Sequence, residues 1–144
     1  MSASPEDVNA GVIDEFRANE GRVGGVLEGT PLLLLHHTGA RSGRHRVNPL
    51  AYLGDHGRYV VVASNGGAAS HPDWYRNTTA HPNVTIEVGV RTIEAVAREA
   101  TGDERERLFR AQVERFPTLR EYELLTDRVI PVVVLTPRDE GQRT

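Results

Sequence analysis

The chain has 144 residues, of which 38% are apolar and 26% charged, and its formal net charge is −3. This size suits one domain over residues 1–144, with one core and one cleft. The chain has no cysteine, and all 17 basic residues are arginine, which excludes disulfides, iron–sulfur clusters, thiolate zinc sites and lysine Schiff bases. The acidic balance argues against nucleic acid as a partner.

The first residues predict a helix over about residues 5–20. Ser4 and Pro5 are typical of a helix start, and Val8, Val12 and Phe16 follow at helical spacing. The acidic residues of this helix disfavour binding to a membrane surface, because interfacial helices usually carry a basic polar face. No apolar run is long enough to span a membrane and no basic leader precedes one, so we expect a cytoplasmic protein.

Three strands are predicted next. The continuous apolar run at residues 31–37 is typical of a buried strand, and residues 44–53 alternate well enough to pair back on it. Residues 58–63 predict a third strand, which ends in a glycine-rich loop at residues 64–69. A short helix at residues 71–77 should end before Pro82, because a residue that precedes proline avoids helical angles.

The second half predicts two strands at residues 84–88 and 92–100, a helix from residue 102 and a short helix after Pro117. Residues 130–135 are apolar and β-branched, and the proline within this run predicts that the first residues of the strand lie at a sheet edge. We expect the tail after Pro137 to be mobile. Five or six strands, mostly in hairpins and with helices at the ends, predict an α+β fold built on a small, mostly antiparallel β-barrel.

Basic residues concentrate between Thr38 and Asn48. This segment carries Arg41, Arg44 and Arg46 without an acidic residue, although the whole chain is acidic. Arginine offers planar, fixed donors to phosphate and carboxylate, and nearby glycines let the backbone approach the same ligand. The segment therefore predicts an anion site, with a solvated hairpin as the alternative.

Other candidate site residues are weaker signals. The amides and hydroxyl of the loop from Ser64 to Gly67 could contact a flat heterocycle or an anion. Trp74 could wall a pocket or belong to the core. His36 and His37 are neighbours on a strand and so should point to opposite faces, and no metal-binding spacing occurs, so we predict no metal site. The motifs of common nucleotide-binding and hydrolase folds are also missing.

Four segments in order resemble the deazaflavin-dependent nitroreductase family. They are Thr38-Gly39-Ala40-Arg41-Ser42-Gly43, Arg46-Val47-Asn48-Pro49-Leu50, Ala63-Ser64-Asn65-Gly66-Gly67 and Pro72-Asp73-Trp74-Tyr75-Arg76-Asn77. The similarity runs from about Asn9 to Leu135. The resemblance implies a split β-barrel related to FMN-binding oxidoreductases, and coenzyme F420, with its anionic phosphodiester and oligoglutamate tail, as the cofactor.

The implied activity is hydride transfer from reduced F420 to a small-molecule acceptor such as a quinone, a nitro compound or an enone. One alternative is an FMN-dependent oxidoreductase with the same barrel. Another is a non-catalytic carrier of F420 or of a lipid-like molecule. The sequence is compatible with a monomer or a homodimer.

The resemblance also implies site residues. Arg41 and Arg46 fall where the family binds the phosphate and tail. The remaining positions implied to bind the cofactor are Ser42, Asn48, Pro49, Ala63, Ser64, Asn65, Gly66, Trp74 and Asn77. A proton must follow the hydride, and Ser64 and Tyr122 are the candidates to donate it.

Overall fold

A computed structural model gives the fold of residues 5–24 and 29–138. The predicted Ser4 cap and the tail from residue 139 lie outside the described residues. The helices are α1 (Pro5–Ala18), α2 (Asp73–Ala80), α3 (Gly102–Arg115) and α4 (Thr118–Leu124), with a 3₁₀ turn η2 (Asn65–Gly67). The strands are β1 (Leu32–Thr38), β2 (His45–Ala51), β3 (Leu53–Asp55), β4 (Arg58–Val62), β5 (Asn83–Val88), β6 (Arg91–Glu99) and β7 (Val132–Pro137).

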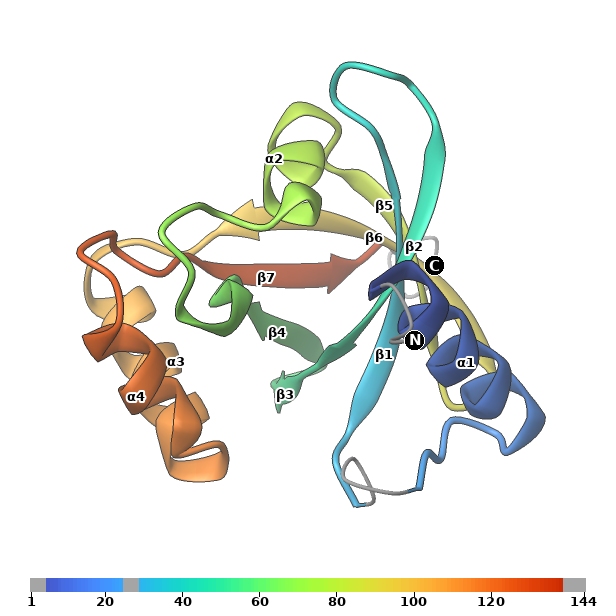
Figure 1. Cartoon of the computed structure of the whole chain (residues 1–144), viewed down its shortest axis with the longest axis horizontal. Helices are drawn as coiled ribbons and strands as arrows, with labels where there is room; N and C mark the ends of the chain where they lie inside the picture. The colour runs from blue at the N-terminus through green and yellow to red at the C-terminus, as the bar shows by residue number, and fades with distance from the viewer. Residues whose placement is uncertain (1–4, 25–28, 139–144) are drawn as a thin grey trace.

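The described strands form one curled antiparallel sheet in the order β2-β1-β5-β6-β7-β4-β3 (Figure 1). Strands β2 and β3 lie at opposite ends of this order, yet only Tyr52 separates them in the chain. The Tyr52 N–H donates to the Pro31 carbonyl at 3.1 Å. The two edges of the sheet therefore meet at this residue, and the curled half-barrel confirms the predicted α+β barrel.

Burial on both faces explains the continuous apolar strands. Alternate side chains of a strand point to opposite faces. In β1, Leu33 and Leu35 enter the inner core, whereas Leu32 and Leu34 pack beneath α1. Strand β7 is likewise buried between the inner core and a second cluster that contains side chains of α3.

Helices α1 and α3 cover the outer face of the sheet, whereas α2 packs against the inner core through Trp74. Figure 1 shows α1 at one end of the molecule, α3 and α4 together at the other end, and α2 above the sheet. Helix α3 buries Leu108, Phe109 and Gln112. Within residues 5–24 and 29–138, none of the helices has the length and apolar content that crossing a membrane requires.

Two predictions about strands are wrong. Strand β7 is an interior strand between β6 and β4, not one that begins at a sheet edge. Pro131 precedes the strand, so its missing N–H removes no ladder hydrogen bond, and its carbonyl accepts one from Ala63 at 2.9 Å. The single strand predicted at residues 44–53 is two strands, because β2 pairs with β1 whereas β3 pairs with β4.

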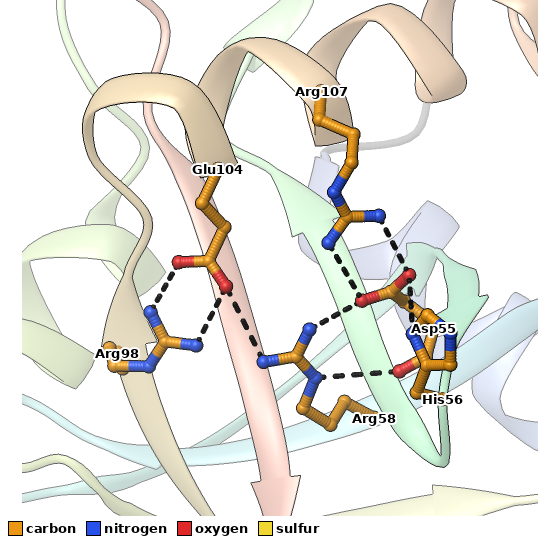
Figure 2. A network of polar contacts seen from close by, with 6 residues as sticks. All are labelled: Asp55, His56, Arg58, Arg98, Glu104 and Arg107. Carbon is orange, nitrogen blue, oxygen red and sulfur yellow. Dashed lines mark hydrogen bonds and ion pairs between the residues drawn. The ribbon is translucent and has the colours of Figure 1, made fainter.

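Charged side chains fasten α3 to the β3–β4 hairpin and to β6 (Figure 2). Asp55 accepts hydrogen bonds from Arg58 and from Arg107, the latter with a distance of 3.1 Å from Nη1. Glu104 of α3 pairs with Arg58 at 3.4 Å and accepts from Arg98 of β6 at 2.7 Å. The hydrogen bond from Arg107, followed by that from Arg58, holds the pKa of Asp55 well below its usual range.

Candidate functional site

The arginine loop (residues 39–46) forms the tip of the β1–β2 hairpin. Its backbone closes on itself, because the Gly39 N–H donates to the Arg44 carbonyl at 2.8 Å and the Gly43 N–H donates to the Gly39 carbonyl at 2.9 Å. The Ser42 hydroxyl accepts from the Arg44 N–H at 3.2 Å. A side chain at Gly39 would clash with this hydroxyl. The turn is therefore tight, and the side chains of Arg41, Arg44 and Arg46 are exposed.

Two cavities adjoin the arginine loop and share Ser42 and Arg46. The α2 cavity, of about 510 Å³, lies between the loop and α2 and is lined by Gly39, Ala40, Arg41, Ser42, Arg46, Asp73, Arg76 and Asn77. The α1 cavity, of about 480 Å³, is lined by Asn9, Ala10, Ile13, Ser42, Arg44, His45, Arg46, Val47 and Asn48. The structure thus brings together Arg41, Ser42, Arg46, Asn48 and Asn77, all of which the sequence nominated.

Positive charge dominates both cavities. The α2 cavity has one acidic residue, Asp73, and Arg76 already pairs with it at 3.3 Å. Among the side chains that the structure describes, which begin at Asn9 in α1, no acidic residue lines the α1 cavity. Among the ion pairs of the described residues, none includes Arg41, Arg44 or Arg46. These guanidinium groups can therefore meet a phosphate or carboxylate without first giving up an internal partner.

A buried polar group lies behind the arginine loop. His37 of β1 is 3% exposed and Asn77 of α2 is 6% exposed. His37 Nε2 lies 2.7 Å from Asn48 Oδ1, and His37 Nδ1 lies 3.0 Å from Asn77 Nδ2. Asn77 Oδ1 accepts from the Ala40 N–H at 2.9 Å. Burial lowers the pKa of His37, and the charge of Arg46 adds to that effect.

The other face of the hairpin carries a second polar group. His36 Nδ1 lies 2.8 Å from His45 Nε2, and His36 Nε2 lies 2.6 Å from Glu87 of β5. Glu87 also accepts two hydrogen bonds from Arg17 of α1. Hydrogen bonding by Arg17, followed by that of His36, lowers the pKa of Glu87. His36 and His37 therefore have separate partners on opposite faces, as the sequence predicted.

The loop after β4 adopts an unusual backbone. Asn65 has φ of +50°, a left-handed conformation that asparagine tolerates better than most residues. Its amide donates to the Ser70 carbonyl at 3.1 Å. Gly67 has φ of +83°, and a Cβ there would lie 3.2 Å from the Tyr122 Cα. The turn η2 therefore packs closely against α4.

Arg128 binds this loop from the segment between α4 and β7. It donates to the carbonyls of Ala63 at 3.1 Å, Ser64 at 2.6 Å and Ala68 at 2.9 Å. It also contacts His71 Nδ1 at 2.9 Å. Since arginine only donates, His71 must accept through this nitrogen. Burial, followed by the charge of Arg128, lowers the pKa of His71, which favours that neutral form.

Several nominated residues lie away from the two cavities. Ser64, Asn65 and Tyr122 line neither of them. Ser64 precedes η2, and Tyr122 packs partly against the cluster that contains Val60 and Leu108. Gly66 lies within η2, and the other three nominated residues have structural contacts. Trp74 and Ala63 are buried in the inner core, and Pro49 pairs with Leu34 on the edge strand β2.

Sequence reasoning missed three residues that shape these surroundings. Arg76 was quoted only as part of a motif, although its helical neighbours Asp73 and Asn77 line the same cavity. Period-two alternation placed His37 on the same face as Leu35 but could not identify its partners on α2. Nothing in the local sequence signals that Arg128 reaches a loop about 60 residues away.

Comparisons with known proteins agree with one another. A family model described as F420H2-dependent quinone reductase matches residues 11–137. An F420H2-dependent quinone reductase of Mycobacterium tuberculosis is 38% identical over 127 residues, which cover 85% of each chain. A solved F420H2-dependent reductase, FDR-A, is 42% identical over 73% of this chain and 93% of its own, with a TM-score of 0.67. A solved domain-swapped dimer is 38% identical over 92% of this chain and 99% of its own, with a TM-score of 0.70.

Proposed function

The chain belongs to the F420H2-dependent quinone reductase family, and we propose that its arginine loop holds the anionic part of coenzyme F420 while a quinone is reduced. The observation that carries this proposal is the charge of the two cavities on either side of Arg46. Arg41, Arg44, Arg46 and Arg76 line them, and Asp73 is the one acid among the described lining residues. A phosphodiester and carboxylates are the groups that such planar donors bind best.

Reduced F420 supplies the hydride when it is bound, so the task of the chain is to position the reactants and to exclude water. The closed turn at Gly39 and Gly43 supports positioning, because it holds the arginines on a rigid hairpin. We propose that the loop from Ala63 to Gly66 lies along the deazaflavin, with Trp74 supporting that loop from the core. Arg128 would keep the loop in place through its bonds to three carbonyls.

The proton that completes quinone reduction needs a donor. We propose Ser64 or Tyr122 for this role. They lie on neighbouring elements, because Ser64 begins the turn η2 and Tyr122 belongs to α4, which packs against that turn. A variant that lacks the donor should bind F420 normally and should reduce the acceptor slowly, so binding and turnover separate the two functions.

The first test is a fluorescence titration of the purified protein with F420, with FMN as the competing ligand. Micromolar F420 binding without comparable FMN binding supports the proposed cofactor. The reverse preference would assign the chain to the flavin-dependent branch of the same barrel. Tight F420 binding with no acceptor reduced across a broad panel of quinones, nitro compounds and enones would instead support a carrier.

We also propose that the chain forms a homodimer. A solved relative that this chain covers almost completely is a domain-swapped dimer. This chain exposes Leu124, Leu125 and Val129, which are 82%, 69% and 74% accessible, in and just after α4. A partner subunit that covered these side chains would remove apolar surface from water. Light scattering should give twice the mass of the chain, and a monomeric mass at assay concentrations would refute the dimer.

A further inference from the structure

The hydrogen bonds around His37 have one internally consistent direction. The Ala40 backbone N–H can only donate, so the Asn77 atom that faces it must be the carbonyl oxygen. The Asn77 amide nitrogen therefore faces His37, and His37 Nδ1 must accept from it without a proton of its own. The proton of the neutral ring lies on Nε2, which donates to Asn48 Oδ1.

This chain of bonds connects three elements at the base of the arginine loop. His37 belongs to β1, Asn48 to β2 and Asn77 to α2, and the last link reaches the loop backbone at Ala40. His37 is also the cross-strand partner of Arg46, which lines both cavities. Through this bond to Ala40, a side chain of α2 holds the backbone of the loop.

We propose that His37 is a positioning residue for cofactor binding, which holds the arginine loop in its binding conformation through Asn77 and Ala40. This inference rests on the proposed binding of F420 by the loop. His37 is buried and is not among the described lining residues of either cavity. In this proposal it nevertheless controls how the loop presents its arginines. We also predict that only the neutral ring can perform this function.

Protonation of His37 would break this series of hydrogen bonds at its centre. A proton on Nδ1 would face the Asn77 amide nitrogen, so two donors would oppose each other at a separation of 3.0 Å. The charged groups around the ring act in both directions. Arg46 and His45 on β2 oppose protonation, whereas Asp73 on α2 favours it. Burial is the largest influence and keeps the pKa below the ordinary histidine value, so the loop stays held at neutral pH and is released in acid.

The first experiment uses the protein without ligand, so that its outcome does not depend on F420 binding. Nitrogen-15 NMR of the histidine rings should show His37 with a protonated Nε2 and an accepting, unprotonated Nδ1. The Ala40 amide should be protected from hydrogen exchange at neutral pH and should lose protection as His37 takes up a proton below about pH 6.5. The opposite tautomer, or an Ala40 amide whose protection ignores the state of His37, would overturn the proposal.

The second experiment measures F420 affinity against pH for the wild type, His37→Phe and a control, His56→Asn, which changes an exposed histidine of the β3–β4 turn that is absent from the lining of both cavities. Phenylalanine keeps a ring but has no nitrogen to bridge Asn48 and Asn77, so His37→Phe should bind about 2- to 10-fold more weakly at neutral pH, the effect of one lost hydrogen bond. The ratio of its dissociation constant to that of the wild type should approach one in acid. This ratio removes any titration of the ligand itself. His56→Asn should keep the pH dependence of the wild type, and loss of that dependence in the control would refute its assignment to His37.

Asn77→Asp provides a test that does not require removal of the histidine. A carboxylate at this position still accepts from Ala40 and can also accept from a protonated His37 Nδ1. The pKa of His37 should therefore rise, and the Ala40 amide should remain protected in acid. An unchanged histidine titration in Asn77→Asp would refute the inference. If instead all these NMR results hold but F420 does not bind, the proposed function fails and the structural role of His37 stands.

Discussion

Gly67 offers a sharp test of how the loop after β4 meets α4. Its φ is +83°, and a Cβ there would lie 3.0 Å from Leu125 Cδ1, 3.1 Å from Leu125 Cβ and 3.2 Å from Tyr122 Cα. Gly57 has nearly the same φ, +82°, but an added Cβ would meet no atom within 4 Å. The two glycines therefore have nearly the same φ and differ in packing. Alanine at each position separates the free-energy cost of backbone strain from that of the steric clash.

Gly57→Ala should lose about 1–2 kcal/mol of unfolding free energy, because an L-residue is strained in the left-handed region. Gly67→Ala should lose that amount and about 1–3 kcal/mol more, the usual cost of overpacking, since the Tyr122 backbone cannot rotate away. Urea denaturation of both variants, monitored by circular dichroism, measures the difference. Equal losses in the two variants would refute the close packing of η2 on α4.

Three further predictions concern charged groups. Arg46→Ala should weaken F420 binding by about 1.5–3 kcal/mol through loss of a charge-assisted hydrogen bond, whereas Arg91→Ala, an exposed change at the start of β6, should not alter the titration. Arg128→Gln should speed hydrogen exchange across residues 63–71, as measured by mass spectrometry, because three carbonyl contacts disappear. Asp55→Asn should lower the melting temperature by several degrees at pH 7. Because the pKa of Asp55 is lowered by folding, its stabilisation is present above about pH 3.9 and is lost in acid, so the difference from the wild type should vanish as the pH falls.

The sequence predicts features that depend on neighbouring residues better than features that depend on distant contacts. Turn residues and hydrophobic period placed the helices and most strands within a few residues, because both are set by neighbours along the chain. The same patterns could not show that residues 44–53 divide at Tyr52. That division depends on β3 pairing with β4, and a strand pattern does not identify its partner. The interior place of β7 was missed for the same reason.

The candidate site shows the same division. The sequence by itself determined that an acid-free group of arginines lies on a tight turn, since Gly39, Gly43 and the arginines are all local to it. Only the tertiary structure decided what stands behind that turn. The bond from the Ala40 N–H to Asn77 joins residues 37 positions apart, and that from Arg128 to the Ser64 carbonyl joins residues 64 positions apart. Such contacts follow from how the sheet curls and where the helices pack, because a side chain's partners are fixed only when distant strands come together.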